Sequence, residues 1–211
     1  MNLKSNTLRF ALPATALAAA LALAGCGAPG PSTAPTSSAA PSSTGGAHGN
    51  HEMPMGTPNA GFNAGDVMFA QMMVPHHEQA VEMSDIVLAK PGLDPRVAQL
   101  AEQIKGAQAP EIATLRGWLG EWGQPSMMPG GAGHGMDGMM SADDLEKLRA
   151  AGAAEAAKLF LTQMIAHHEG AVSMAQTEKS SGQHAGAKSM AESIIASQTK
   201  EIEDMKALLA S

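Results

Sequence analysis

Cysteine and aromatic residues are nearly absent from this chain of 211 residues. It has one cysteine, no tyrosine, four phenylalanines and two tryptophans. A single cysteine cannot form a disulfide within the chain, so the folded part must be stabilised by packing. So few aromatic rings leave little surface on which nucleic-acid bases or sugars could stack. The net charge of −7 also argues against a nucleic-acid partner, because phosphate backbones bind positively charged surfaces.

The single cysteine, Cys26, ends an N-terminal segment that is typical of a bacterial lipoprotein signal. Lys4 and Arg9 supply its positive start, and the apolar stretch 10–24 is too short for a comfortable membrane span. Small residues directly before a lone cysteine resemble a lipobox, which predicts cleavage of the signal peptide 1–25 and attachment of lipid to Cys26. A plain signal peptide and an uncleaved anchor are the alternatives. We therefore expect an extracytoplasmic protein that its N-terminal lipid anchors to the bacterial cell membrane.

The rest of the chain divides into a tether and a folded domain. Residues 26–61 are rich in proline, serine, threonine, glycine and alanine, and they predict a disordered tether without a core. Residues 62–211 carry helical spacing of apolar residues and no strand signal of any weight. Proline and glycine breaks divide this domain into a helical hairpin, a linker rich in methionine and glycine, a short helix and a second hairpin. Their predicted ranges are 66–122, 123–140, 142–150 and 153–210.

What the chain has in abundance is repetition. Residues 69–83 read FAQMMVPHHEQAVEM and residues 160–174 read FLTQMIAHHEGAVSM, so a His-His-Glu core with flanking methionines recurs 91 positions later. The helices that follow these two motifs repeat at an offset of 90. Neither hairpin can bury its apolar seam alone. The sequence therefore predicts an all-α fold, a four-helix bundle made of two tandem helical hairpins with pseudo-twofold symmetry.

Polar side chains interrupt the predicted apolar seam at equivalent places in the two hairpins. The antiparallel register predicts that Gln108 faces His76 and that Glu111 faces Met73, with the equivalent pairing in the second hairpin. Burying such groups without partners costs on the order of several kcal/mol each. Either a hydrogen-bond network that fixes the helix register or a bound metal ion must therefore satisfy them. The interruptions are His76 and His167 on the first helices, and Gln108, Glu111, Gln198 and Glu201 on the second helices.

Histidines and methionines of the repeated motif are the candidate metal ligands of the helical part. A methionine and a histidine one turn apart on a helix can both reach one ion, and Met73 and His77 have this spacing. The alternative is that the methionines only fill the core. Together with the two glutamates of the seam, the candidate set is His76, His77, Met73, Met83, Glu111, His167, His168, Met164, Met174 and Glu201.

A second group of soft ligands lies outside the long predicted helices. Thioethers suit Cu(I), and outside the cytoplasm they avoid the disulfide formation that thiolates risk. Drift in the composition of low-complexity linkers is the alternative explanation. We favour metal capture by these segments. The loop candidates are His51, Met53, Met55, Met127, Met128, His134, Met136, Met139 and Met140.

The two motifs Met73-x-x-His76-His77-Glu78 and Met164-x-x-His167-His168-Glu169 resemble the domain-of-unknown-function 305 family. The resemblance covers roughly residues 62–210 and implies a ferritin-like bundle in a secreted or lipid-anchored bacterial protein. Because some members of the family are linked to copper binding and copper resistance, it also implies copper handling here. The Glu-x-x-His pairs of di-iron carboxylate bundles are missing, which counts against iron oxidation chemistry.

The favoured function is therefore that of a cell-surface lipoprotein that binds metal, preferably copper(I), for sequestration, buffering or resistance. We do not expect an enzyme. Two alternatives stay open. One is a redox enzyme with a His/Glu iron or manganese centre in the core, and the other is a structural or adaptor bundle without metal. The expected partners are metal ions and the membrane but not nucleic acid, and a homodimer or another protein partner stays open.

Overall fold

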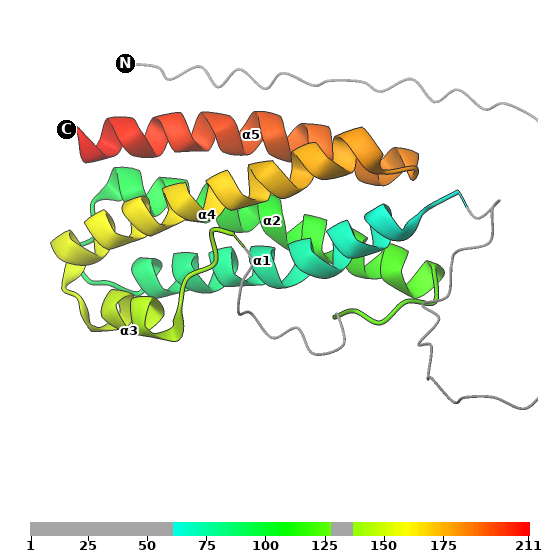
Figure 1. Cartoon of the computed structure of the whole chain (residues 1–211). Helices are drawn as coiled ribbons and strands as arrows, with labels where there is room; N and C mark the ends of the chain where they lie inside the picture. Colours follow the sequence, from blue (N-terminus) through cyan, green and yellow to red (C-terminus); the bar gives the residue numbers. More distant parts are fainter. Residues whose placement is uncertain (1–60, 128–136) are drawn as a thin grey trace, which may run out of the picture. The chain divides into compact units, whose positions relative to one another are not determined.

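The computed structural model describes residues 61–127 and 137–211, and every regular element in these two ranges is an α-helix. This confirms the predicted all-α fold class. The predicted signal peptide, tether and lipidated Cys26 lie outside the described residues. No helix in the described part combines the length and the apolar character needed to span a bilayer. The helices are α1 (Ala64–Leu88), α2 (Pro95–Glu121), α3 (Ala142–Ala150), α4 (Ala153–Ser181) and α5 (Ala185–Leu209) (Figure 1).

Local side-chain signals define the starts of the helices. Asn63 caps α1 because its side-chain oxygen accepts hydrogen bonds from the backbone N–H groups of Gly65 and Asp66. The Asp66 carboxylate in turn accepts one from the backbone N–H of Asn63. Ser141 and Asp144 form the same reciprocal capping box at α3. These bonds satisfy N–H groups that the first turn of a helix leaves without intrahelical partners.

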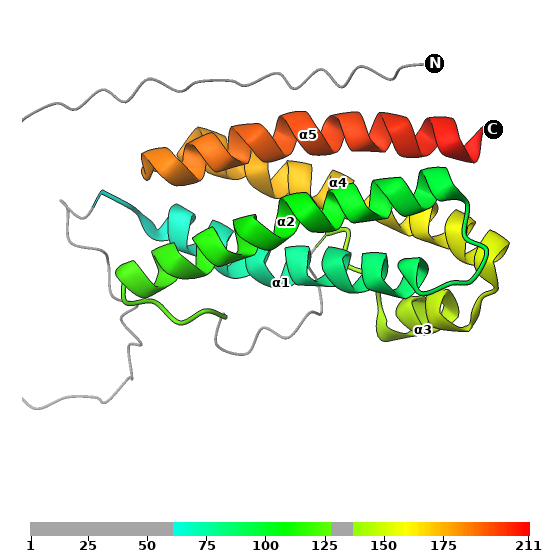
Figure 2. The same cartoon turned by 180° about the vertical axis from the view of Figure 1, so that it is seen from behind.

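The two hairpins pack against each other mainly through α1 and α4. Each of these helices also packs along its hairpin partner, α2 or α5, and α3 covers one side of the α1–α4 pair (Figure 1). By contrast, α2 and α5 barely touch each other, and Figure 2 shows them from behind. Three other helices therefore surround α1, and three surround α4, so each of the two buries a wide stripe of its surface.

Two apolar clusters fill the interior, and a polar layer separates them along the helices. On α1, one cluster ends at Val74 and the other begins at Ala80. On α4, the clusters are bounded by Met164 and Ala171. The offset of 91 exchanges the clusters, because Met73 and Met164 belong to different ones, as do Ala80 and Ala171. Such an exchange is what an approximate twofold axis between α1 and α4 produces.

Candidate metal centre

His76 of α1 and His167 of α4 meet in the middle of the polar layer. Both side chains are fully buried, and their ring centroids lie 3.7 Å apart with an interplanar angle of 39°. The twofold relation of the hairpins brings these equivalent residues together. Among the described residues, neither nitrogen of either ring has a hydrogen-bond partner. A buried polar group without a partner costs on the order of 1–3 kcal/mol, so this pair needs an explanation.

Burial keeps both central rings neutral. It lowers the pKa of His76 to about 3, and the electrostatic effect of the neighbouring His77 acts in the same direction. Burial also lowers the pKa of His167 well below its ordinary value, and the neighbouring His76 adds to the shift. The backbone carbonyl of Asp137 lies near the His76 ring without the geometry of a hydrogen bond, and it opposes the shift only in part. Neutral imidazole is the form that binds metal ions.

A second pair of histidines flanks the centre, and each is bonded to a glutamate of its hairpin partner. His77 Nε2 lies 2.8 Å from Oε2 of Glu111. His168 Nε2 lies 2.6 Å from Oε2 of Glu201. Both histidine side chains are fully buried, whereas those of Glu111 and Glu201 are 24% and 18% exposed. The glutamates therefore connect the buried layer to the surface of the bundle.

The glutamate contacts determine which ring nitrogen of the flanking histidines remains available. A carboxylate accepts a hydrogen bond, so Nε2 of His77 and of His168 donates, and in the neutral tautomer that this bond favours Nδ1 is left as an acceptor. In the part of the chain that the structure describes, neither Nδ1 has a partner. A carboxylate behind one nitrogen and a lone pair on the other is the arrangement that orients metal-ligating histidines.

The glutamate pairing differs from the register that the sequence predicts. Glu111 was expected opposite Met73, but its carboxylate contacts His77. The equivalent difference occurs at Glu201, which contacts His168. The physical reason is the wide buried stripe of α1 and α4, which turns both residues of each His-His pair inward. All four histidines therefore share the layer.

Gln108 of α2 and Gln198 of α5 extend the layer toward the outer helices. Their exposed fractions are 2% and 3%. Both polar atoms of the Gln108 amide and the amide oxygen of Gln198 lack a partner among the described residues. The layer therefore concentrates polar atoms that a hydrogen-bond network serving only the register would have joined to one another.

The four methionines of the repeated motif differ in how close they lie to the layer. Met73 and Met164 are fully buried and precede His76 and His167 by three residues, which is about one helical turn. Met83 is fully buried and Met174 partly buried, and each follows its central histidine by seven residues, or about 10 Å along the helix. Only Met73 and Met164 therefore border the layer.

The glutamates of the His-His-Glu motif point away from the layer. Glu78 forms an ion pair with Arg116 of α2, and Oε1 of Glu169 lies 3.5 Å from Nζ of Lys206 on α5. All four side chains are about half exposed. Because residues 116 and 206 are also related by the repeat, these are equivalent surface contacts that join the helices of each hairpin.

The loop candidates are only partly within the described residues. Met127 is 51% exposed, and Met139 and Met140 are partly buried. Sequence reasoning missed the contact that Met140 makes, in which its backbone pairs with the Gln79 side chain. The available signal was the difference between Gln79 and Gly170 at equivalent places in the repeat. The candidates outside the described residues are His51, Met53, Met55, Met128, His134 and Met136.

Within residues 61–127 and 137–211, no group of three or more His, Cys, Asp or Glu side chains is arranged to hold an ion. The candidate ligands come instead in pairs. One is the central pair, His76 with His167, and two others join a methionine to a histidine one turn away on the same helix. Any one ion in the layer would therefore be coordinated by few imidazoles, with methionine thioethers close by.

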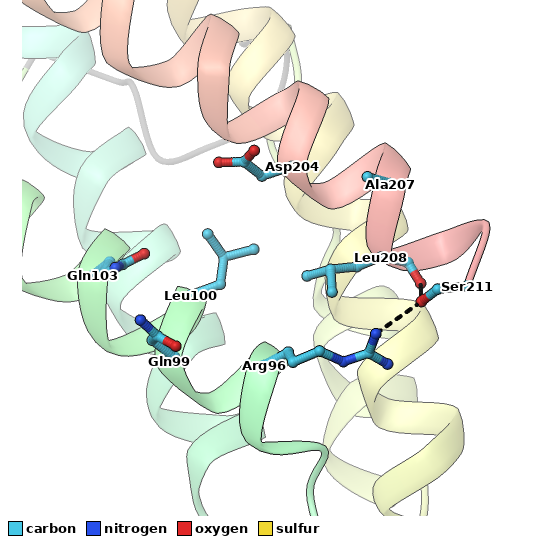
Figure 3. Close-up of a pocket in the computed structure, with 8 residues that line it drawn as sticks. All are labelled: Arg96, Gln99, Leu100, Gln103, Asp204, Ala207, Leu208 and Ser211. Carbon is cyan, nitrogen blue, oxygen red and sulfur yellow. Dashed lines mark hydrogen bonds between the residues drawn. The ribbon is translucent and has the colours of Figure 1, made fainter.

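A surface hollow of about 430 Å³ lies at one end of the bundle, between the start of α2 and the end of α5 (Figure 3). Leu100 and Leu208 contribute its apolar lining, and the Arg96 guanidinium donates to Oγ of Ser211 at its edge. On α2 the lining ends at Gln103, more than one helical turn before Gln108. The hollow is therefore separate from the polar layer.

Comparison with known proteins identifies the family. The sequence matches the family described as "Domain of unknown function (DUF305)" over residues 66–209. The chain belongs to the DUF305 family. No functionally curated protein matches the sequence.

Solved structures of DUF305 proteins resemble this one over the helical part. One from Streptomyces coelicolor, named as a secreted protein, is 35% identical, with a TM-score of 0.65 over 69% of this chain and 91% of that one. A DUF305 fragment from Deinococcus radiodurans is 30% identical, with a TM-score of 0.64 over 74% and 99% of the two chains. CopM in its Cu(I)-bound form is 31% identical, with a TM-score of 0.58 over 68% and 94%.

Proposed function

We propose that this protein binds metal ions in the polar layer between its hairpins, and that copper(I) is the ion. The observation that carries the proposal is the set of buried imidazole nitrogens without partners among the described residues. They are both nitrogens of His76 and His167 and Nδ1 of His77 and His168. A layer that served only the helix register would bond its polar groups to one another, because leaving them unpaired is costly. A bound ion supplies the missing partner of the one nitrogen in each neutral ring that carries a lone pair.

The donor chemistry favours a soft ion. Neutral imidazoles and the thioethers of Met73 and Met164 suit copper(I), whereas harder ions such as manganese prefer carboxylates. Glu111 and Glu201 already accept hydrogen bonds from His77 and His168, so they act as orienting groups rather than as ligands. CopM, whose structures include Cu(I)-, Cu(II)- and silver-bound forms, supports the same assignment by its similarity to this chain.

We propose that the ion is cargo and that the protein holds it outside the cytoplasm for sequestration, buffering or resistance, without catalysing a reaction. The lipobox before Cys26 supports anchoring to the membrane by an N-terminal lipid. The Streptomyces coelicolor relative, named as a secreted protein, supports the compartment. Exposed Met127 and the other methionines of the linker fit capture of a soft ion at the surface.

A competition titration with Cu(I) against a chromophoric chelator tests the core site, using the chain without residues 1–26. The variant His76→Ala/His167→Ala should lose the core ion, while ions bound by the loop methionines remain. The control Glu78→Ala/Glu169→Ala changes the same motif at exposed positions and should retain the core ion. Unchanged copper stoichiometry and affinity after replacement of all four layer histidines would overturn the proposal.

Two further measurements discriminate the alternatives. A purely structural layer predicts that adding Cu(I) leaves the melting temperature unchanged, whereas binding to the native state should raise it. A redox enzyme predicts that iron or manganese copurifies and that the protein consumes oxygen. Elemental analysis of protein from copper-, iron- and manganese-supplemented cells decides between these outcomes.

A further inference from the structure

The segment Asp137–Met140, which leads into α3, is docked onto α1 by a side chain of the repeated motif. Nε2 of Gln79 donates to the backbone carbonyl of Met140 at 2.9 Å, and the backbone N–H of Met140 donates to Oε1 of Gln79 at 2.7 Å. The Gln79 side chain is almost buried, at 9% exposure. One amide side chain thus pairs with the backbone N–H and C=O of a single residue. We call Asp137–Met140 the strap.

On the other side, the strap lies directly against the backbone of α4. A Cβ atom at Gly170 would come within 2.0 Å of the Asp137 carbonyl oxygen. Gly138 has φ +84°, and a Cβ atom there would meet the Ala166 carbonyl oxygen at 2.6 Å and that of His167 at 3.0 Å. Only glycine permits such an approach on both sides. The contact therefore depends on the absence of a side chain at residue 170.

The two docking positions are equivalent in the repeat, since residues 79 and 170 are 91 apart. Gln79 follows the first His-His-Glu motif, and Gly170 follows the second. The hairpins differ here. The first supplies the Gln79 amide that bonds to the strap, and the second supplies, at Gly170, the space in which the strap lies. Because α1 and α4 are the helices that meet at the central histidines, the strap crosses their junction at that level (Figure 1). The nearby Asp137 carbonyl agrees with this placement.

We propose that the strap gates the entry of metal ions to the central histidine pair, with Gln79 and Gly170 as its positioning residues. In the docked state it covers the junction of α1 and α4, and both central histidines are fully buried. Release requires loss of two hydrogen bonds and one backbone contact, a small local opening that leaves the helices packed. The strap therefore controls the rate of metal exchange rather than the affinity. This inference rests on the proposed metal-binding function.

The substitution Gly170→Ala tests the gate because the new methyl group cannot fit under the docked strap. Gly117→Ala is the matched control, since it makes the same change within a helix where nothing lies within 4 Å of the new atom. Gln79→Leu is the second variant, which removes both hydrogen bonds at similar volume. The transfer rate of Cu(I) to excess chelator should rise about tenfold in Gly170→Ala and Gln79→Leu. The rate should stay unchanged in Gly117→Ala, and the affinities of all variants should agree within about threefold.

A second readout needs no metal. Acylation of His76 and His167 by diethylpyrocarbonate, followed by peptide mass spectrometry, reports how often the layer opens in the metal-free protein. Both strap variants should react faster than the control. If the exchange and acylation rates of both strap variants match those of the wild type, the proposed gate is wrong but the proposed metal binding is unaffected. If affinity falls without faster exchange, the strap is part of the site and the gate is also wrong. Faster acylation in a protein that binds no copper would show that the strap covers the histidines, but it would overturn the proposed function and with it the gating of metal ions.

Discussion

At one end of the bundle, Val87 of α1 and Ala157 of α4 belong to the same buried apolar cluster. At the other end, the equivalent residues are Glu178 of α4 and Asp66 of α1, both almost completely buried. Burial raises the pKa of Glu178 to about 8, and Asp66 contributes to the shift. The same place in the repeat thus holds an apolar contact in one half and a carboxyl pair in the other.

The carboxyl pair has a local structural role. Asp66 accepts hydrogen bonds from the backbone N–H groups of Asn63, Gln183 and His184, so it joins the start of α1 to the turn between α4 and α5. The middle of the bundle behaves differently, because both halves place a His-His pair in the same layer. The carboxyl pair occurs at only one end of the bundle, whereas both hairpins contribute the same residues to the histidine layer. The carboxyl pair therefore has a structural role at one end of the bundle, whereas the histidine layer is the candidate site.

The largest expected effect comes from moving a carboxyl to the apolar end. Val87→Glu should lower the free energy of unfolding at pH 7 by about 3–5 kcal/mol, because the new carboxyl would be buried in an apolar cluster in which its counterpart on α4 is Ala157. Glu178→Val at the equivalent place should cost much less, since Asp66 keeps its backbone donors. Urea unfolding measures both. Similar losses in the two variants would show that the ends do not differ as described.

The next effect concerns the middle of the bundle. Replacing both central histidines by leucine should raise the free energy of unfolding of the metal-free protein by about 1–4 kcal/mol, because unpaired buried polar atoms are removed. The same variant should lose any stabilisation by Cu(I). Urea unfolding with and without Cu(I) measures both quantities. If the metal-free variant were less stable than the wild type, the packing of the two central histidines would itself stabilise the fold.

A smaller effect is expected from pH at the carboxyl end. The pKa of Glu178 is raised in the folded state to about 8 from the ordinary 4.5. The stability that its protonated form contributes is present below about pH 4.5 and is lost as the pH rises through about 8. Glu178→Gln should remove this dependence between pH 5.5 and 8.5, as unfolding curves at both values would show. Parallel pH profiles in wild type and variant would contradict the shift.

The smallest effect belongs to the exposed glutamates of the motif. Glu78→Ala and Glu169→Ala should each lower the free energy of unfolding by at most about 1 kcal/mol, since exposed ion pairs contribute little. The two losses should also resemble each other because the contacts are equivalent. Thermal melts compare them. A tenfold loss of Cu(I) affinity in either variant would instead make that glutamate a ligand.

Much of the candidate site follows from the amino-acid sequence, but the pairing of its residues does not. The repeat and the seam identified His76 and His167 as residues at the interior. The partner of Glu111 was misplaced because successive residues on a helix point about 100° apart, and the rotation of each helix depends on all of its neighbours. Gln79 and Gly170 were missed because their role is visible only where a segment distant in sequence contacts them.

The amino-acid sequence by itself determined the helices, their hairpin pairing and the twofold repeat, because apolar periodicity and capping are local properties of the chain. It also determined the soft donor chemistry, since side-chain type does not depend on the fold. Only the tertiary structure decided which buried nitrogens have no partner, that the carboxyl pair replaces an apolar contact, and that the strap lies over the central histidines. These features depend on the packing of many side chains at once, which fixes the rotation and spacing of whole helices.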